Sequence, residues 1–274
     1  MDRYVVTGNP IAHSQSPFIH QAFADQTGQQ ISYERLLLPL DGFAQGIADF
    51  VKQGGLGCNV TVPFKTDALA VADELSERAS LAEAVNTLKV MSDGRLFADN
   101  TDGAGLVMDL KRLGVPLTDK RILLLGAGGA ARGVMGPLLA EQPAMLVVTN
   151  RTRARADELA SRFASLGPVS SQPLDALQGS FDLIINSTSA SLQGERLTLP
   201  ASLCHSGTHV YDMMYGREET PFMCWATEQG VSHRYDGLGM LVGQAAESFY
   251  LWRGVRPNMA PVLQALRTRL EQAQ

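Results

Sequence analysis

Cysteine and histidine are scarce in this sequence. It holds three cysteines among 274 residues, Cys58, Cys204 and Cys224, and five histidines. The cysteines are odd in number and far apart, which argues against a disulfide framework and against the paired spacing of a zinc site. We therefore expect reduced thiols and no bound metal ion.

Long apolar runs and a strong charge of one sign are missing as well. No stretch approaches the ~18 apolar residues of a membrane-spanning helix, and no signal-peptide block follows Met1. The formal net charge at pH 7 is −5, which provides no broad basic surface for nucleic acid. These absences favour a cytoplasmic protein with a small-molecule partner and argue against membrane or nucleic-acid partners.

Short apolar strands alternate with helices along most of the chain. Asp93-Gly94, between two of the predicted strands, is a strong hairpin signal. After residue 120 the alternation continues with strands that read as parallel. The predicted strands are residues 4–6, 31–38, 58–62, 87–91, 95–98, 121–125, 145–149, 182–186 and 209–212, and the predicted helices are residues 16–23, 42–51, 103–113, 240–252 and 260–270.

A glycine-rich turn follows the predicted strand 121–125. The segment 126–131 reads Gly-Ala-Gly-Gly-Ala-Ala and opens a helix, the order that a dinucleotide-binding βαβ unit requires. Gly126 permits a tight turn, Gly128 lets the backbone approach a pyrophosphate, and Ala131 lets the helix pack closely on the strand. A helix N-terminus there would offer unpaired N–H groups to phosphates. The alternative is a glycine turn with a purely structural role.

A basic segment follows the next predicted strand, 145–149. An NAD-binding chain usually carries a carboxylate there for the ribose 2′-hydroxyl, but this chain reads Asn-Arg-Thr-Arg-Ala-Arg over residues 150–155. Three guanidiniums are available for a 2′-phosphate. The alternative is a solvated basic start of a helix, but cations are unfavourable in a first helical turn unless an anion is near. The segment therefore predicts NADP as the cofactor.

The last two predicted helices are not followed by a strand that could extend the nucleotide-binding sheet. We expect them to pack back on the first lobe, which is then discontinuous in sequence. The predicted fold class is α/β with two lobes, an N-terminal α/β substrate domain and a Rossmann-type parallel-sheet NADP domain. The predicted domains are residues 1–101 plus 238–274 and residues 102–237.

Polar side chains cluster in two places before the glycine turn. Ser14 and Ser16 lie in a loop that opens a helix and can bind an oxygen-rich ligand, although Ser16 also suits a helix N-cap with Pro17 after it. Asn59 and Thr61 lie on one face of a predicted strand, followed at its exit by Lys65, for which a solvated charge is the alternative. Further polar segments stand at the boundaries of predicted elements, where helix or turn capping is the alternative role. They are Asn86-Thr87 and Asn100-Thr101-Asp102-Gly103.

Taken together, these motifs resemble the shikimate dehydrogenase family in their order and spacing. The resemblance extends from about residue 8 to about residue 252. It rests on the motifs HSxSP, NVTxPxK, the Asn86-Thr87 pair, NTDGxG, GAGGAA, NRT, DMMY…TPF and DGLGMLVxQA. The resemblance implies an NADP-dependent, reversible interconversion of 3-dehydroshikimate and shikimate in the aromatic amino-acid (chorismate) pathway, by a monomer or homodimer.

The resemblance also implies the residues of the site. Lys65 and Asp102 would be the catalytic pair. The residues that would contact substrate are Ser14, Ser16, Thr61, Asn86, Asp102, Tyr215 and Gln244. The residues that would bind the cofactor are Gly126, Ala127, Gly128, Gly129, Ala130, Asn150, Arg151, Thr152, Arg155, Met213 and Gly237.

The reaction expected of these residues is hydride transfer with a proton moving on or off the substrate oxygen. A lysine ammonium can donate that proton and stabilise the developing alkoxide, and a lysine is a better acid than base at neutral pH. Asp102 is expected to share the substrate hydroxyl's proton with Lys65. The hydroxyls of Ser14 and Ser16 are the expected anchor for the substrate carboxylate.

Two departures from the family pattern and two rival functions remain open at this point. Ser191 stands where the family usually has glycine, and Arg217-Glu218 stands where a proline is common; both departures bear on cofactor binding. One rival is an enzyme of the same architecture that also accepts quinate, with NAD as its cofactor. The other is a catalytically silent NADP-binding sensor, which predicts a cofactor loop without matching substrate residues.

Overall fold

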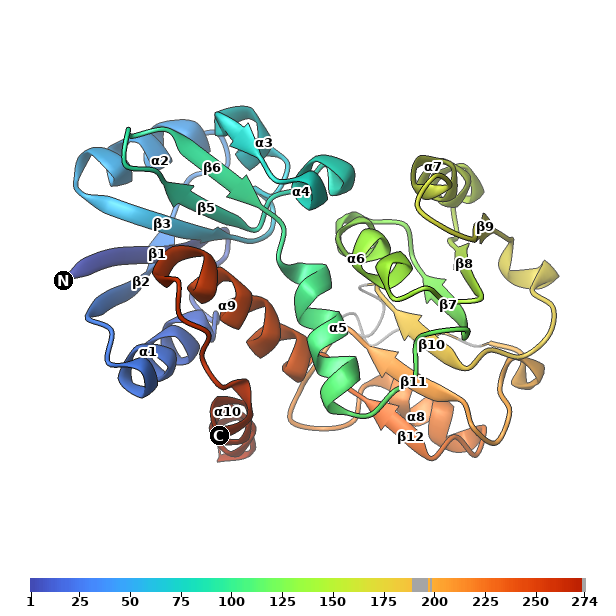
Figure 1. The fold of residues 1–274 in the computed structure, drawn as a ribbon. Coiled ribbons are helices and arrows are strands. Elements are labelled where there is room, and N and C mark those ends of the chain that lie inside the picture. The colour runs from blue at the N-terminus through green and yellow to red at the C-terminus, as the bar shows by residue number, and fades with distance from the viewer. Residues whose placement is uncertain (189–196, 198, 273–274) are drawn as a thin grey trace. The chain divides into compact units, whose positions relative to one another are not determined.

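The computed structural model describes residues 1–188, 197 and 199–272. The chain divides into two compact units (Figure 1). Unit 1 consists of Met1–Gly105 and Val242–Leu266, and unit 2 consists of Leu106–Leu241 and Arg267–Gln274. Ser191 lies outside the described residues.

Unit 1 is built on a mixed sheet with the strand order β2-β1-β3-β5-β6-β4. The first three strands in this order are parallel, and β5 pairs antiparallel with both β3 and β6. The strands are β1 (Asp2–Gly8), β2 (Ile31–Leu37), β3 (Gly55–Val60), β4 (Glu74–Leu75), β5 (Thr87–Val90) and β6 (Leu96–Asp99). The helices are α1 (Ser16–Thr27), α2 (Phe43–Lys52), α3 (Asp67–Val71) and α4 (Glu77–Ala82), joined by parts of α9 (Leu238–Arg253) and α10 (Met259–Gln272).

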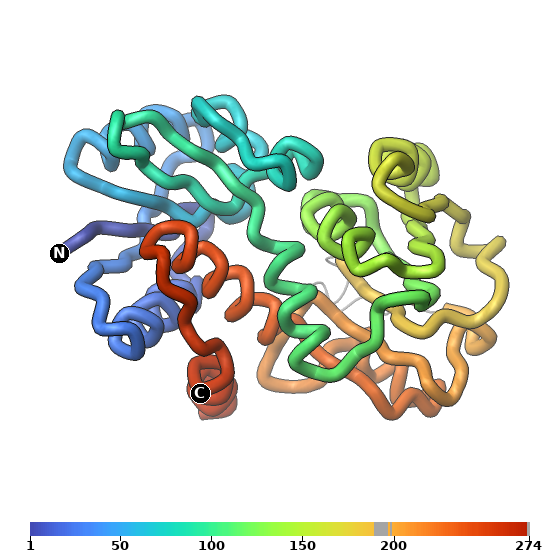
Figure 2. Tube along the Cα trace, in the orientation of Figure 1, coloured from blue at the N-terminus to red at the C-terminus, as the bar shows by residue number. Residues whose placement is uncertain are grey.

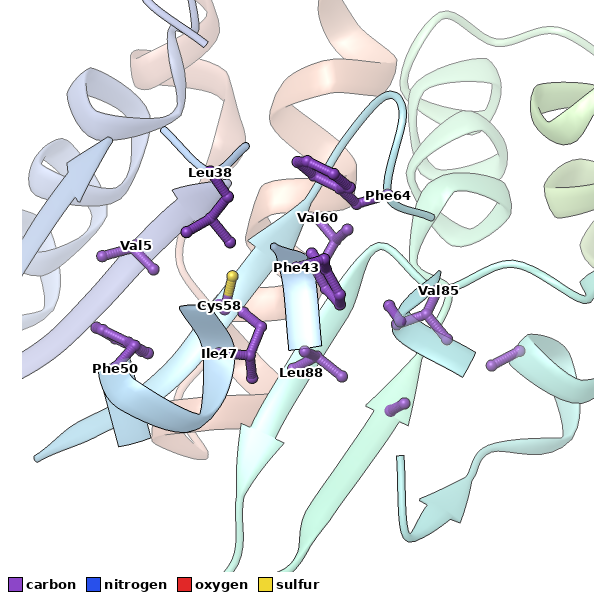
Figure 3. Close-up of a cluster of buried hydrophobic side chains, with 13 residues drawn as sticks. Val5, Leu38, Phe43, Ile47, Phe50, Cys58, Val60, Phe64, Val85 and Leu88 are labelled. Carbon is purple, nitrogen blue, oxygen red and sulfur yellow. The ribbon is translucent and has the colours of Figure 1, made fainter. Parts of the chain in front are cut away.

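Alternation along β1 and β3 sends side chains to both faces of this sheet. Val5, Cys58 and Val60 face α2 and pack in an apolar cluster with its aromatic residues (Figure 3). Asn59 points to the opposite face, where its amide bonds Ser248 on α9. In Figure 1, α2 accordingly covers one face of the sheet, and α1 and α9 cover the other.

The apolar cluster holds the backbone that carries Lys65. Phe64 is completely buried and stacks on Phe43 of α2 with ring centroids 5.1 Å apart. The N–H of Val85, another cluster member, donates to the carbonyl oxygen of Lys65 over 2.8 Å. The buried ring before Lys65 and this backbone bond fix the position from which the lysine side chain extends.

Unit 2 is built on a parallel sheet with the strand order β12-β11-β10-β7-β8-β9. Counted from β7, this is the 3-2-1-4-5-6 order of a dinucleotide-binding fold. The strands are β7 (Arg121–Leu125), β8 (Met145–Thr149), β9 (Val169–Ser171), β10 (Leu183–Asn186), β11 (His209–Asp212) and β12 (His233–Tyr235). The helices are α6 (Gly129–Ala140), α7 (Arg153–Phe163) and α8 (Pro221–Glu228), with parts of α5 (Asp102–Arg112), α9 and α10 and the short 3-10 helices η1 (Leu174–Ala176) and η3 (Ala201–Leu203).

The chain passes between the units inside helices. It leaves unit 1 within α5, after Gly105, returns within α9, after Leu241, and crosses to unit 2 again within α10, after Leu266 (Figure 2). Inside unit 1, Gly243 lies so close to Gly105 that a Cβ at 243 would be 2.8 Å from the Gly105 carbonyl oxygen. Glycine at position 243 therefore permits close packing of α5 and α9.

Most predicted elements are confirmed, including the strands at 121–125, 145–149 and 209–212 with the same bounds. The predicted N-cap is wrong, because α1 begins at Ser16 itself and Gln15 is its N-cap. The Ser16 N–H instead donates to Ser14 Oγ over 3.3 Å, so the serine before the helix accepts the bond. Within the described residues, no helix is both long enough and apolar enough to cross a membrane.

Candidate active site

Lys65 and Asp102 form an ion pair in unit 1. Lys65 follows β3, and Asp102 is the first residue of α5. The first segment of unit 1 extends to Gly105, so both residues belong to this unit. Their Nζ and Oδ2 atoms are 2.5 Å apart, and the two side chains are 25% and 11% exposed. The lysine is thus open enough to reach a small molecule, while its counter-ion is mostly shielded from water.

Asn86 holds the other oxygen of the Asp102 carboxylate. Its Nδ2 donates to Asp102 Oδ1 over 2.9 Å and to Gln244 Oε1 over 3.2 Å. The Thr101 backbone N–H, which can only donate, bonds Asn86 Oδ1 over 2.8 Å. The amide oxygen must therefore face Thr101, and this orients the amino group toward Asp102. One carboxylate oxygen faces the lysine, and the other is fixed by an amide donor.

The structure thus brings four predicted residues into one hydrogen-bonded group: Lys65, Asn86, Asp102 and Gln244. Ser14 and Ser16 bond each other where α1 begins. The N–H of Thr61 donates to the carbonyl oxygen of Thr7 on β1 over 2.9 Å.

Tyr215 belongs to unit 2, where it follows β11. Burial, with the charge of Asp236 added to it, raises the pKa of the Tyr215 hydroxyl. The phenol therefore offers a neutral hydrogen-bonding hydroxyl at physiological pH.

The glycine turn of unit 2 leads from β7 into α6. Gly126 has φ +107°, and a Cβ there would lie 2.6 Å from Ser187 Oγ. Gly128 is the N-cap of α6, and Gly129 begins it. A Cβ at either of these two glycines would meet no atom of the described protein within 4 Å. Packing inside the protein therefore explains Gly126 but not Gly128 or Gly129, where the missing side chains leave the backbone open to a ligand.

A pocket of about 400 Å³ lies beside this turn in unit 2. Arg155 from the predicted basic segment lines it and Arg151 and Thr152 do not, although all three residues are exposed. Residues 155, 158, 159 and 162 share one face of α7, because they are three and four positions apart. The lining residues are Ala127, Gly128, Gly129, Arg132, Arg155, Glu158, Leu159 and Arg162.

Three charged residues of this pocket were not predicted: Arg132, Glu158 and Arg162. Arg162 Nη2 and Glu158 Oε1 are 3.4 Å apart and form an ion pair. The helical spacing from Arg155 to Glu158 and Arg162 was the available signal in the sequence. With three guanidiniums and one carboxylate, the lining is electrostatically suited to an anion.

Met213 and Gly237 are close neighbours within unit 2. A Cβ at 237 would lie 2.0 Å from the Met213 carbonyl oxygen, so the packing requires glycine there. Asn150 is placed by a bond from its Nδ2 to the Thr152 carbonyl oxygen over 2.9 Å. Arg217 and Glu218, which stand where the family often has a proline, are both exposed.

His205 and His209 have the four-residue spacing by which two metal ligands can share one face of a helix. They flank a turn that precedes β11 instead, so this spacing does not bring them together on a helix. In the part of the chain that the structure describes, no three histidine, cysteine or acidic side chains form a group suited to a metal ion.

His20 lies in the core of unit 1, near the Asn59 side chain. It is completely buried on α1 and stacks on Tyr33 with ring centroids 4.2 Å apart. Neither ring nitrogen has a hydrogen-bond partner among the described residues. Burial lowers the pKa of His20 to about 3, an effect that the nearby Asn59 side chain only partly offsets.

This buried histidine predicts a pH-dependent stability. Because the pKa of His20 is about 3 in the folded protein and 6.5 ordinarily, the unfolded chain binds the extra proton below pH 6.5. The contribution of neutral His20 is fully present above pH 6.5 and is lost as the pH falls toward 3, by about 1.4 kcal/mol per pH unit. In denaturant titrations from pH 7 to 4.5, His20→Phe is expected to lose stability less steeply than the wild type.

The exposed His13 provides the control for this measurement. His13→Phe should keep the wild-type dependence of unfolding free energy on pH. Equal slopes for the wild type and His20→Phe would show that His20 is not the group responsible.

Three family models match successive parts of the chain. The shikimate dehydrogenase substrate binding domain matches residues 6–88, the shikimate / quinate 5-dehydrogenase model matches 109–194, and the shikimate 5'-dehydrogenase C-terminal domain matches 237–267. A curated relative from Aeromonas hydrophila, named shikimate dehydrogenase (NADP(+)), is 58% identical over 270 residues, which are 98% of this chain and 99% of the relative. The chain belongs to the shikimate dehydrogenase family.

Solved structures agree with this membership of the shikimate dehydrogenase family. Shikimate 5-dehydrogenase from Thermus thermophilus, in complex with NADP(H) and shikimate, has a TM-score of 0.88 at 34% identity and covers 98% of this chain and 100% of its own. An Ael1 enzyme from Pseudomonas putida has a TM-score of 0.93 at 45% identity, over 97% of this chain and 98% of its own. The family, predicted from the motifs, and the two-lobed α/β fold, predicted from the alternation of strands and helices, are thus confirmed.

Proposed function

We propose that this chain is an NADP-dependent shikimate dehydrogenase that reversibly reduces 3-dehydroshikimate to shikimate in the chorismate pathway. The names of the curated relatives and the ligands of the Thermus structure support this reaction and this cofactor. We assign residues 1–101 plus 238–274 to the substrate and residues 102–237 to NADP. We place the activity in the cytoplasm, where the free thiols Cys58, Cys204 and Cys224 stay reduced.

The residues of unit 2 fit NADP. The open backbone at Gly128 and Gly129 suits a pyrophosphate at the N-terminus of α6, and the arginine-lined pocket beside it suits further phosphate. When bound, NADPH supplies the hydride for the substrate carbonyl carbon. The residues that we propose to hold it are Gly126, Ala127, Gly128, Gly129, Ala130, Asn150, Arg151, Thr152, Arg155, Met213 and Gly237.

The ion pair of Lys65 and Asp102 is the observation that carries the proposed chemistry. In the reduction, the Lys65 ammonium donates a proton to the substrate oxygen as negative charge develops there. In the oxidation, the same proton returns from the substrate hydroxyl. Asp102, held by Asn86 at Oδ1, keeps the ammonium in place and bonds the reacting hydroxyl. The pair thus acts as a unit for proton transfer.

Neutral donors and acceptors are proposed to bind the rest of the substrate. The hydroxyls of Ser14 and Ser16 bind the carboxylate, and the amide and hydroxyl groups of the remaining residues bind the ring hydroxyls. These remaining residues are Thr61, Asn86, Tyr215 and Gln244.

A nicotinamide absorbance assay of the purified protein tests this function. With shikimate and NADP we expect turnover, and with quinate or NAD we expect much lower kcat/KM. Turnover of quinate with NAD at the same efficiency would favour the quinate enzyme. Binding of NADP without turnover of either acid would favour the silent sensor and contradict the proposal.

A further inference from the structure

A buried group of polar side chains lies behind Asn86 in unit 1. We call Asn59, Thr87, Thr101 and Ser248 the polar hub; each is at most 5% exposed. They come from β3, β5, the segment before α5, and α9. Polar groups this deep in a core are costly unless their hydrogen bonds are satisfied, so their arrangement is tightly constrained.

Ser248 lies where the bonds of the polar hub converge. Its Oγ is 2.8 Å from Thr87 Oγ1, 3.1 Å from Thr101 Oγ1 and 3.1 Å from Asn59 Nδ2. It also lies 3.0 Å from the carbonyl oxygen of Gln244, one turn earlier on α9. One hydroxyl thus joins α9 to residues from three other parts of unit 1.

The directions of these bonds follow from groups that can only accept or only donate. Asn59 Nδ2 lies 3.2 Å from the backbone carbonyl oxygen of Asn86, which can only accept, so the amino group of Asn59 faces the polar hub. Asn86 Oδ1 can also only accept, so the Thr87 hydroxyl gives its proton to it, over 2.9 Å. Ser248 Oγ therefore accepts from Asn59 Nδ2 and gives its own proton to Thr87 Oγ1, over 2.8 Å, while the Thr101 hydroxyl donates to the Gln244 carbonyl oxygen.

The result is a fixed orientation of the Asn86 amide. Asn86 Oδ1 receives the Thr87 hydroxyl and the Thr101 N–H. Both bonds hold the amino group on the side of Asp102 and Gln244. An Asn86 amide turned the other way would place its oxygen against the carboxylate, which repels it.

We propose that Ser248 is a positioning residue for the reaction: through Thr87 and Asn86 it sets the direction in which the Asp102 carboxylate faces Lys65. This inference rests on the proposed roles of Lys65 and Asp102.

Ser248→Ala tests this role, because it removes the hydroxyl with little change in volume. We expect kcat for shikimate oxidation to fall about 10- to 100-fold, the range that a small misplacement of reacting groups produces. KM for shikimate and the Kd for NADP, measured by calorimetry, should change much less. The dependence of kcat on pH should shift, because the environment of the proton-transferring pair changes.

Two further variants separate positioning from loss of stability. Thr208 is a buried threonine of unit 2 whose Oγ1 donates to the Phe181 carbonyl oxygen over 2.7 Å. Thr208→Val should lower the melting temperature but keep the wild-type kcat and its pH profile. Ser248→Thr, which keeps a hydroxyl, should recover part of the kcat. If Ser248→Ala does not fold, Thr87→Val removes the next hydroxyl in the series of hydrogen bonds from Ser248 to Asn86. The same fall in kcat and the same shift of its pH dependence are expected of this variant.

A folded Ser248→Ala or Thr87→Val enzyme with wild-type kcat and pH profile would overturn the positioning role while the proposed function stood. The same conclusion follows if kcat falls only in proportion to the folded fraction. A wild type without shikimate turnover would overturn both proposals.

Discussion

Replacing Lys65 by alanine is expected to lower kcat by about 10²–10⁴-fold, the usual contribution of a positioned acid–base group. The variant loses both the proton donor and the positive charge that balances the alkoxide. Substrate affinity should change less, because these interactions strengthen mainly in the transition state. Initial rates at saturating shikimate and NADP, followed at the nicotinamide band, measure the effect.

Asp102→Asn shows whether the two residues act together. It should also lower kcat, because the amide cannot hold the ammonium of Lys65 as a carboxylate does. The double variant should lose much less than the product of the two single effects. NADP binding and the melting temperature serve as controls and should be largely retained. A Lys65→Ala enzyme with nearly normal kcat would show that Lys65 is only a solvated charge beside Asp102.

Replacing Arg151 and Arg155 together by alanine is expected to raise KM for NADP strongly and to leave the use of NAD little changed. A charge-assisted contact to a 2′-phosphate is worth about 1.5–3 kcal/mol, or about 10- to 150-fold per contact. Arg155 lines the pocket beside the glycine turn and Arg151 does not, so Arg155→Ala alone should account for most of the change. Calorimetry with 2′,5′-ADP and with 5′-AMP measures the contribution of the 2′-phosphate to the binding free energy without turnover.

Arg153 supplies a matched control on the same helix. It is exposed, pairs with Asp157 at 3.5 Å and is outside the pocket lining. Arg153→Ala removes one positive charge and should leave the preference for 2′,5′-ADP nearly unchanged. An unchanged ratio of NADP to NAD efficiency in the Arg151 and Arg155 double variant would rule out their role in cofactor choice.

The parts of the fold that the sequence predicted well are those with short-range signals. The strands β7 and β8 are apolar runs bounded by polar residues, and both kept their predicted bounds. The strands β4, β9 and β12 were missed because they are two or three residues long with partly or fully exposed side chains, so no apolar run marks them. Ser16 was taken as the N-cap of α1 because it precedes Pro17, but the helix begins at Ser16 and Gln15 is its N-cap.

The candidate site was likewise predicted only where short-range sequence signals exist. The motifs identified Lys65, Asn86, Asp102 and Gln244, which the structure joins by hydrogen bonds. The sequence carried no sign of Ser248, because it lies within an apolar helix and its partners Thr87 and Asn59 are 161 and 189 residues away. Only the packing of α9 on the sheet brings these hydroxyls together.

The division of unit 1 between two chain segments has a consequence for how the protein is made. A ribosome completes Met1–Gly105 first, but Val242–Leu266 follows only after the whole of Leu106–Leu241. Domains generally fold as their segments emerge during synthesis. We therefore expect Leu106–Leu241, the main segment of unit 2, to fold before Val242–Leu266 emerges, while the sheet face carrying Asn59 and Thr87 is not yet covered by α9. During translation, the hydrogen-bonded group around Lys65 and Asp102 is then completed only after this segment of unit 2 has folded.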